Sequence, residues 1–143
     1  MTLQQAIDFD LYFRCYVVGQ RRVHVMQYDP RRAHAERYVL DGPAIDPAMH
    51  ARVMDDCLKL CRALGYDLNT VEFAVQNGTP YAIDFLNPAP DADLHSVGPD
   101  NFEWIVDAVT DLAVEQARLG PQVMKELRWA GFLNPQQTAA AGD

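Results

Sequence analysis

The order of hydrophobic and polar positions along the chain predicts two β-hairpins separated by a helix. Runs of aromatic and β-branched residues favour extended strands, and breaks such as Val18-Gly19-Gln20-Arg21 and Asp29-Pro30 are typical of turns between them. The predicted strands are residues 9–18, 23–28, 71–76 and 81–86, with a short additional strand at 38–40.

Two longer stretches follow helical spacing. Asp46 precedes Pro47, a pair typical of a helix N-cap and first turn, and Gly65 is a natural C-terminal stop. A second helix is predicted near Asp100, which forms a capping-box-like pair with Glu103. The apolar positions of the first helix lie on one face, which we expect to be buried: Met49, Val53, Cys57, Leu60 and Leu64.

The resulting order is β-β-(β)-α-β-β-α-(α), with a short last helix predicted at residues 122–129. Hairpins on both sides of a helix favour an α+β fold, an antiparallel sheet with helices packed on one face. A length of 143 residues fits one compact domain. We expect this domain to span residues 1–133 and to be followed by a disordered tail at 134–143.

Composition excludes several classes of protein. The formal net charge of −8 argues against nonspecific binding to nucleic acid or to an anionic membrane surface. No apolar run reaches membrane-spanning length, and the first ten residues lack the layout of a signal peptide. The odd number of cysteines, Cys15, Cys57 and Cys61, in apolar surroundings is typical of reduced thiols in a cytoplasmic protein.

Charge is unevenly distributed along the chain. Residues 63–117 hold ten acidic side chains and no Lys or Arg. The stretch from residue 12 to residue 39 holds six arginines, Arg14, Arg21, Arg22, Arg31, Arg32 and Arg37. The two stretches could neutralise each other, or they could frame a site that holds phosphates on one side and cations on the other.

The second hairpin brings two carboxylates together. A three-residue loop at residues 77–79 pairs apolar residues with apolar residues on one face, and this register places Glu72 directly opposite Asp84. Directly opposed side chains have Cβ atoms roughly 5 Å apart, so the two charges repel. A cation, a shared proton or full exposure to water must offset that repulsion.

Asn87 lies just beyond the end of the second strand and offers a neutral oxygen. Two carboxylates and one amide oxygen suit a hard divalent ion, Mg2+ or Mn2+. Because Mg2+ completes such a sparse shell with water and phosphates, the pattern indicates a nucleotide site more than a structural metal cage. The same spacing fits an exposed acidic sheet face equally well.

These residues resemble the metal-binding end of the ATP-grasp ligases. Glu72, followed by Ile83-Asp84-Phe85-Leu86-Asn87-Pro88-Ala89-Pro90, is similar to the family's acidic residue on one strand and its acid-then-Asn pair on the next, which hold the magnesium ions of ATP. Tyr12-Phe13-Arg14-Cys15-Tyr16-Val17-Val18-Gly19 is similar to the strand whose arginine faces the transferred phosphate. The resemblance covers residues 9–117 and implies the carboxyl-terminal lobe of the ATP-grasp domain. It implies Glu72, Asp84 and Asn87 as metal ligands and Arg14 as the catalytic, ATP-binding residue.

The sequence departs from the family pattern in two ways. The family has one residue between its acid and asparagine, whereas two residues separate Asp84 and Asn87, so a β-bulge is needed if both are to reach one ion. The chain begins near the second lobe, and no glycine-rich phosphate loop is present. We therefore expect the isolated chain to be inactive, and ATP consumption by the purified chain at an enzyme-like rate would refute this.

The implied function is that of a carboxyl-terminal fragment of an ATP- and Mg-dependent carboxylate–amine (or similar) ligase that proceeds through an acyl phosphate. Its implied partners are ATP and a small carboxylate substrate. The alternative is a noncatalytic α+β interaction domain that dimerises. Divalent-metal binding that is lost in Glu72→Ala or Asp84→Ala would favour the ligase, and a tight homodimer without a metal response would favour the alternative.

Overall fold

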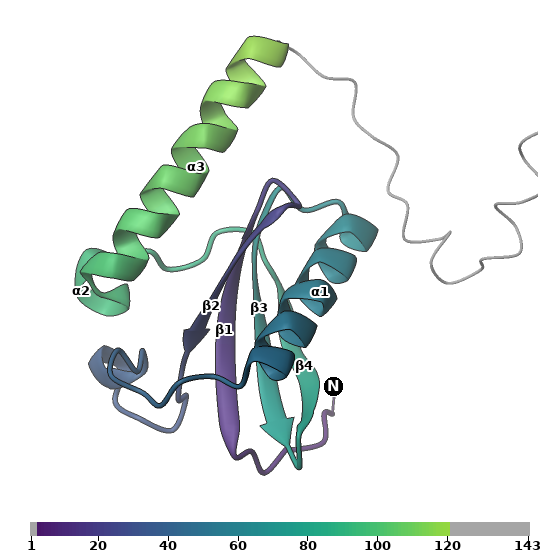
Figure 1. Ribbon diagram of the computed structural model, residues 1–143, viewed down its shortest axis with the longest axis vertical. Helices are drawn as coiled ribbons and strands as arrows, with labels where there is room; N and C mark the ends of the chain where they lie inside the picture. The colour runs from purple at the N-terminus through teal and green to yellow at the C-terminus, as the bar shows by residue number, and fades with distance from the viewer. Residues whose placement is uncertain (1–2, 121–143) are drawn as a thin grey trace, which may run out of the picture.

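A four-stranded antiparallel sheet with strand order β2-β1-β3-β4 forms the centre of the structure (Figure 1). The structure, a computed structural model, describes residues 3–120. The elements in chain order are β1 (Leu11–Val18), β2 (Arg22–Gln27), the 3-10 helix η1 (His34–Glu36), α1 (Pro47–Leu64), β3 (Leu68–Gln76), β4 (Thr79–Asn87), α2 (Leu94–Val97) and α3 (Pro99–Leu119). The predicted helix at 122–129 and tail at 134–143 lie outside the described residues, as does the end of the predicted domain.

Both hairpin turns use left-handed backbone conformations. Gly19 and Gln20 have φ values of 62° and 57°, and Asn77 and Gly78 have φ values of 50° and 72°. Gln76 pairs directly with Thr79, so the second loop has two residues. Positive φ at both loop positions is the type I′ geometry that matches the twist of the strands. The hairpins are confirmed, but the predicted three-residue loop at 77–79 is wrong.

Helix α1 covers one face of the sheet and has the predicted ends. The Asp46 side chain accepts a hydrogen bond of 2.9 Å from the Met49 amide, and Gly65 ends the helix with a φ of 77°. The face of the sheet under this helix is here called the α1 face. Its fully or almost fully buried core consists of Phe13, Cys15, Val17, Val53, Cys57, Cys61, Val71, Phe73 and Val75.

The opposite face of the sheet, here called the tyrosine face, packs against α2 and α3. Tyr12, Tyr16 and Ala74 on this face share a buried cluster with Val97 and Ile105. The α+β class with an antiparallel sheet is confirmed, whereas the expectation that the helices share one face is corrected. Strands β1 and β3 carry apolar side chains on both faces, so each face needs its own cover.

Two local expectations about these elements are also corrected. Helix α3 begins at Pro99 after Gly98, and no side chain caps it, so the Asp100–Glu103 capping box does not form. The predicted strand at 38–40 is reduced to a single bridge between Tyr28 and Tyr38. No helix among residues 3–120 is long and apolar enough to cross a membrane.

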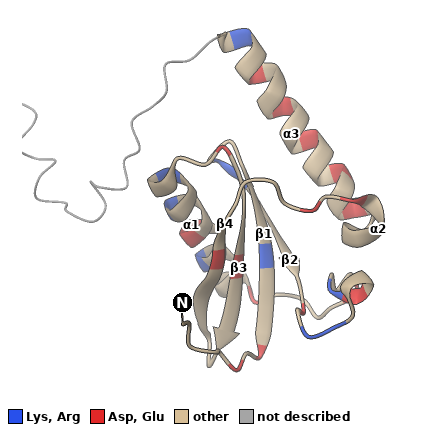
Figure 2. Cartoon of the chain, turned by 180° about the vertical axis from the view of Figure 1, so that it is seen from behind, with Lys and Arg blue, Asp and Glu red and all other residues tan. Residues whose placement is uncertain are grey.

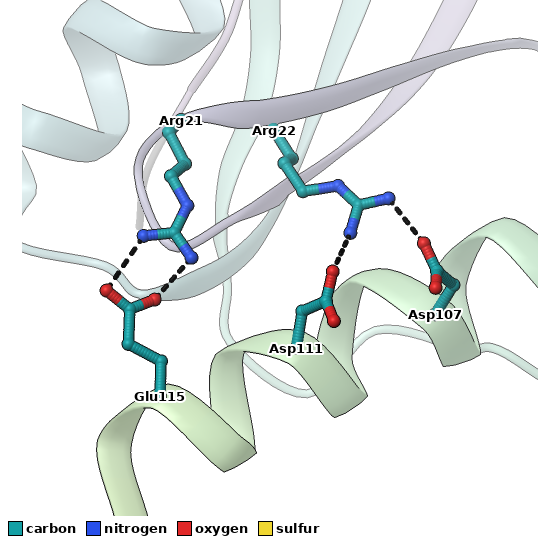
Figure 3. A network of polar contacts seen from close by, with 5 residues as sticks. All are labelled: Arg21, Arg22, Asp107, Asp111 and Glu115. Carbon is teal, nitrogen blue, oxygen red and sulfur yellow. Dashed lines mark hydrogen bonds and ion pairs between the residues drawn. The ribbon is translucent and has the colours of Figure 1, made fainter. Parts of the chain in front are cut away.

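Ion pairs fasten α3 to the first hairpin (Figure 3). Arg21 forms a two-contact pair with Glu115, and Arg22 lies 2.9 Å from Asp111 and 2.7 Å from Asp107. Basic residues of the early stretch thus neutralise acidic residues of the late one, which was the first of the two alternatives for the uneven charge. Asp107 and Asp111 are largely exposed and Glu115 is partly exposed, so each pair contributes little to stability.

The packing of α3 against the first hairpin should depend on pH, because His24 lies between them. Its ring stacks on Trp104 with centroids 4.7 Å apart, and its Nε2 lies 2.7 Å from Asn101 Oδ1. Burial lowers the pKa of His24, so the unfolded chain takes up a proton at a higher pH than the folded protein does.

We therefore expect the free energy of unfolding to fall as the pH is lowered from about 7 to about 5, with part of that fall due to His24. Urea denaturation at both pH values should show a smaller fall in His24→Gln. His34→Gln, at an exposed position, is the matched control for the loss of one histidine. An identical pH dependence in both variants would contradict the assignment to His24.

Candidate functional site

A charged row crosses three neighbouring strands on the tyrosine face (Figure 2). Arg14 on β1 pairs across the sheet with Glu72 on β3, and Glu72 pairs with Asp84 on β4. Two residues further along β3, Thr70 stands between Tyr16 and Asn87. The fold therefore brings Arg14, Glu72 and Asp84 onto one rung of the ladder, with Asn87 two rungs away along β3.

The pairing of Glu72 with Asp84 is confirmed, but it arises differently from the prediction. Near the loop, the two-residue turn fixes a register in which Phe73 lies opposite Ala82. Register shifts on both sides of Glu72 then bring Asp84 opposite Glu72 and Asn87 opposite Thr70. A bulge was expected in this strand, and the shift between Thr70 and Glu72 falls in the stretch of β4 from Asp84 to Asn87.

The two-residue turn also changes which apolar residues meet. Phe73 lies opposite Ala82, not opposite Ile83. Ile83 packs instead with the cluster on the tyrosine face. The prediction of one uniformly apolar face along the whole hairpin is therefore wrong at Ile83, because the two-residue turn shifts β4 by one residue relative to the predicted register.

Glu72 is held by two partners inside the fold. Arg14 Nη1 lies 3.4 Å from Glu72 Oε1, and the Tyr12 hydroxyl donates a hydrogen bond of 2.6 Å to Glu72 Oε2. The Arg14 and Glu72 side chains are only 12% and 16% exposed, whereas Asp84 is exposed. Arg14 and water therefore offset the repulsion between the two carboxylates, so the repulsion alone does not require a metal ion.

Four tyrosines line the surroundings of Arg14. Its guanidinium carbon lies 5.4 Å from the ring centre of Tyr28 and 6.0 Å from that of Tyr38. Burial lowers the pKa of Arg14, but Tyr38, Glu72 and Tyr28 together outweigh that effect and raise it. Burial and the hydrogen bond to Glu72 raise the pKa of Tyr12, which therefore stays protonated and donates at neutral pH.

Asn69 is a site residue that the sequence reasoning missed. It is fully buried on β3, where its Nδ2 donates to the Phe85 carbonyl at 2.8 Å and its Oδ1 accepts from the Asn87 amide at 2.9 Å. The side chain thus replaces ladder hydrogen bonds where the bulge interrupts them, and it fixes Asn87. A polar residue at the start of an otherwise apolar strand was the available signal.

Of the residues expected to hold a divalent ion, Glu72 and Asp84 carry carboxylates and Asn87 carries an amide. Among residues 3–120, no three His, Cys, Asp or Glu side chains gather around a point that could hold a metal. The two carboxylates and the Asn87 amide oxygen would therefore supply only part of a coordination shell, with water and phosphate oxygens completing it. Partial protein shells of this kind are usual for Mg2+ bound with a nucleotide.

Comparison with known proteins finds a solved structure with a similar fold. No family model matches the sequence, and no curated protein matches it. Among solved structures, the crystal structure of D-alanine–D-alanine ligase from Bacillus anthracis complexed with ATP is similar, with 16% sequence identity and a TM-score of 0.58. The match covers 82% of this chain and 41% of the ligase chain, so this chain spans less than half of that protein. The likeness shows that the chain has an ATP-grasp-like fold.

Proposed function

We propose that this chain supplies the metal- and phosphate-binding surface of an ATP- and Mg-dependent ligase. In the full protein, such a ligase joins a small carboxylate to an amine or similar nucleophile through an acyl phosphate. The observation that carries the proposal is the row of Arg14, Glu72 and Asp84 across one sheet face. The row lies in a chain whose fold resembles part of a ligase that was crystallised with ATP.

Each residue of the row has a distinct part in this proposal. The carboxylates of Glu72 and Asp84 and the amide oxygen of Asn87 would hold Mg2+ or Mn2+. A bound divalent ion supplies positive charge to phosphate oxygens during transfer. Arg14 would contact the transferred phosphate, for which a planar guanidinium is well suited.

The contact between Arg14 and Glu72 belongs to the nucleotide-free protein in this account. One arginine and two carboxylates leave a net negative charge, which attracts a divalent ion. With Mg·ATP bound, Glu72 would hold the ion in place of the guanidinium, and Arg14 would contact the phosphate. The contact of 3.4 Å is long for a charge-assisted hydrogen bond, which favours such an exchange.

The proposal also includes a cytoplasmic location and substrate binding outside this chain. Cys15, Cys57 and Cys61 are buried free thiols, which suits the reducing conditions of the cytoplasm. The carboxylate substrate and its nucleophile would bind largely through parts of the ligase that this chain does not contain.

The proposal is tested by titrating the purified chain with Mn2+ and with Mn·ATP while its oligomeric state is measured. We expect a monomer that binds Mn2+ weakly and Mn·ATP more tightly. A tight homodimer with no response to the metal would instead support the interaction domain.

A further inference from the structure

Two buried polar atoms on the tyrosine face have no hydrogen-bond partner. Among residues 3–120, the buried side-chain nitrogen and oxygen atoms without a partner are Arg14 Nε and the Tyr38 hydroxyl. They belong to neighbouring side chains, because the Arg14 guanidinium carbon lies 6.0 Å from the centre of the Tyr38 ring. Buried donors left unpaired destabilise a fold, so two of them in one place call for a common explanation.

The other tyrosines near Arg14 are better accommodated. The hydroxyl of Tyr12 donates to Glu72, and the hydroxyl of Tyr16 donates to the Asp91 carbonyl. Tyr38 is only 8% exposed and is held by its backbone bridge to Tyr28, by edge-to-face packing on that ring and by its contact with Arg14. The fold therefore fixes Tyr38 beside Arg14 without giving its hydroxyl an acceptor.

We propose that the Tyr38 hydroxyl and Arg14 Nε, two donors on neighbouring side chains, bind one phosphate group of the nucleotide together. This inference rests on the proposed function and adds a phosphate-binding residue, from a loop, to the strand residues of the site. A phenol and a guanidinium both donate hydrogen bonds at neutral pH and suit an oxyanion. Burial raises the pKa of Tyr38 to about 12, so its proton stays available for donation.

The charges around this pair set a condition on the ligand. Glu72 lies 3.4 Å from Arg14, Asp84 is opposite Glu72, and Asp91 acts electrostatically on Tyr38. Three carboxylates around one arginine repel a bare phosphate. The two donors should therefore bind a phosphate only when a divalent ion accompanies it, and inorganic phosphate without a metal should not bind.

The test compares Tyr38→Phe with Tyr66→Phe in the full chain. Phenylalanine removes only the hydroxyl, and Tyr66 packs against the core of the α1 face, away from the site. Amide-resolved NMR titrations give the Kd for Mg·ATP and measure Mg2+ alone, ATP with a chelator, and inorganic phosphate with and without Mg2+. Thermal unfolding without any ligand is measured in parallel.

We expect Tyr38→Phe to raise the Kd for Mg·ATP about tenfold or more, the usual effect of losing a hydrogen bond to a charged group. It should leave binding of Mg2+ alone unchanged and should not lower the melting temperature, because the hydroxyl has no partner to lose. Tyr66→Phe should bind Mg·ATP like the wild type. Binding of inorganic phosphate with Mg2+ that is also weakened by Tyr38→Phe would show that a free phosphate suffices.

Three results would overturn the inference. An unchanged Kd in Tyr38→Phe would remove Tyr38 from the site while leaving the proposed function standing. A clear fall in the melting temperature of Tyr38→Phe would show that the hydroxyl already has a partner in the free protein. A wild-type chain that does not bind Mg·ATP would contradict the proposed function itself, and this inference with it.

Discussion

Replacing Arg14 by methionine should lower the free energy of unfolding by about 2–4 kcal/mol, because it leaves Glu72 inside the fold without its cation. The Glu72 side chain is only 16% exposed, so water can replace little of the lost interaction. The Tyr12 hydroxyl still donates to one carboxylate oxygen, which keeps the loss below that of a fully unpaired charge. Urea denaturation of the wild type and of Arg14→Met measures the difference.

Two further variants show whether the pair itself is responsible. In Arg14→Met/Glu72→Gln, the buried charge is gone, so most of the lost stability should return. Arg31→Met removes an arginine that is 61% exposed and that pairs with Asp29, so it should cost much less than Arg14→Met. If Arg14→Met cost no more than Arg31→Met, the Arg14–Glu72 contact would not be a stabilising pair in solution.

The second large effect concerns divalent-metal binding. Asp84→Asn should weaken binding of Mn2+ about tenfold or more, because it removes one of two anionic ligands from a site with few protein donors. Asp84 is exposed, so this variant should fold with nearly unchanged stability, within about 0.5 kcal/mol of the wild type. Glu72→Gln should weaken binding similarly, although it also removes the partner of Arg14.

Glu103→Gln is the matched control, because it removes one negative charge from an exposed position on α3. If all three variants changed the affinity for Mn2+ equally, the effect would come from the net charge of the protein. In that case Asp84 and Glu72 would belong to an exposed acidic sheet face, as the spacing alone allowed.

Local signals in the sequence were enough to predict most of the secondary structure. Asp46, Pro47 and Gly65 mark the ends of α1 because capping and the left-handed C-terminal residue are properties of a few neighbouring residues. Asn77-Gly78 marks the second hairpin for the same reason. The pairing of Glu72 with Asp84 also followed from pattern, although through a loop of the wrong length.

Contacts between distant segments could not be predicted in this way. No local pattern in the sequence indicates that β1 pairs with β3, so the contact between Arg14 and Glu72 was not predicted. Asn69 was missed for the same reason, because its side chain bonds to β4 at residues 16 and 18 positions further along the chain. The sequence analysis did not predict that helices would also cover the tyrosine face, because it assigned no packing partner to Tyr16 and Ala74.

The most direct test of the metal–phosphate site is to locate Mn·ATP on the chain by paramagnetic broadening of its amide NMR signals. A metal–phosphate site at this rung predicts that the amides of Glu72, Asp84 and Asn87 broaden first and that Asp84→Asn weakens this broadening. Broadening that begins instead at the exposed acidic residues of α3, Asp107 and Asp111, or that is absent at every concentration of Mn·ATP, would contradict it.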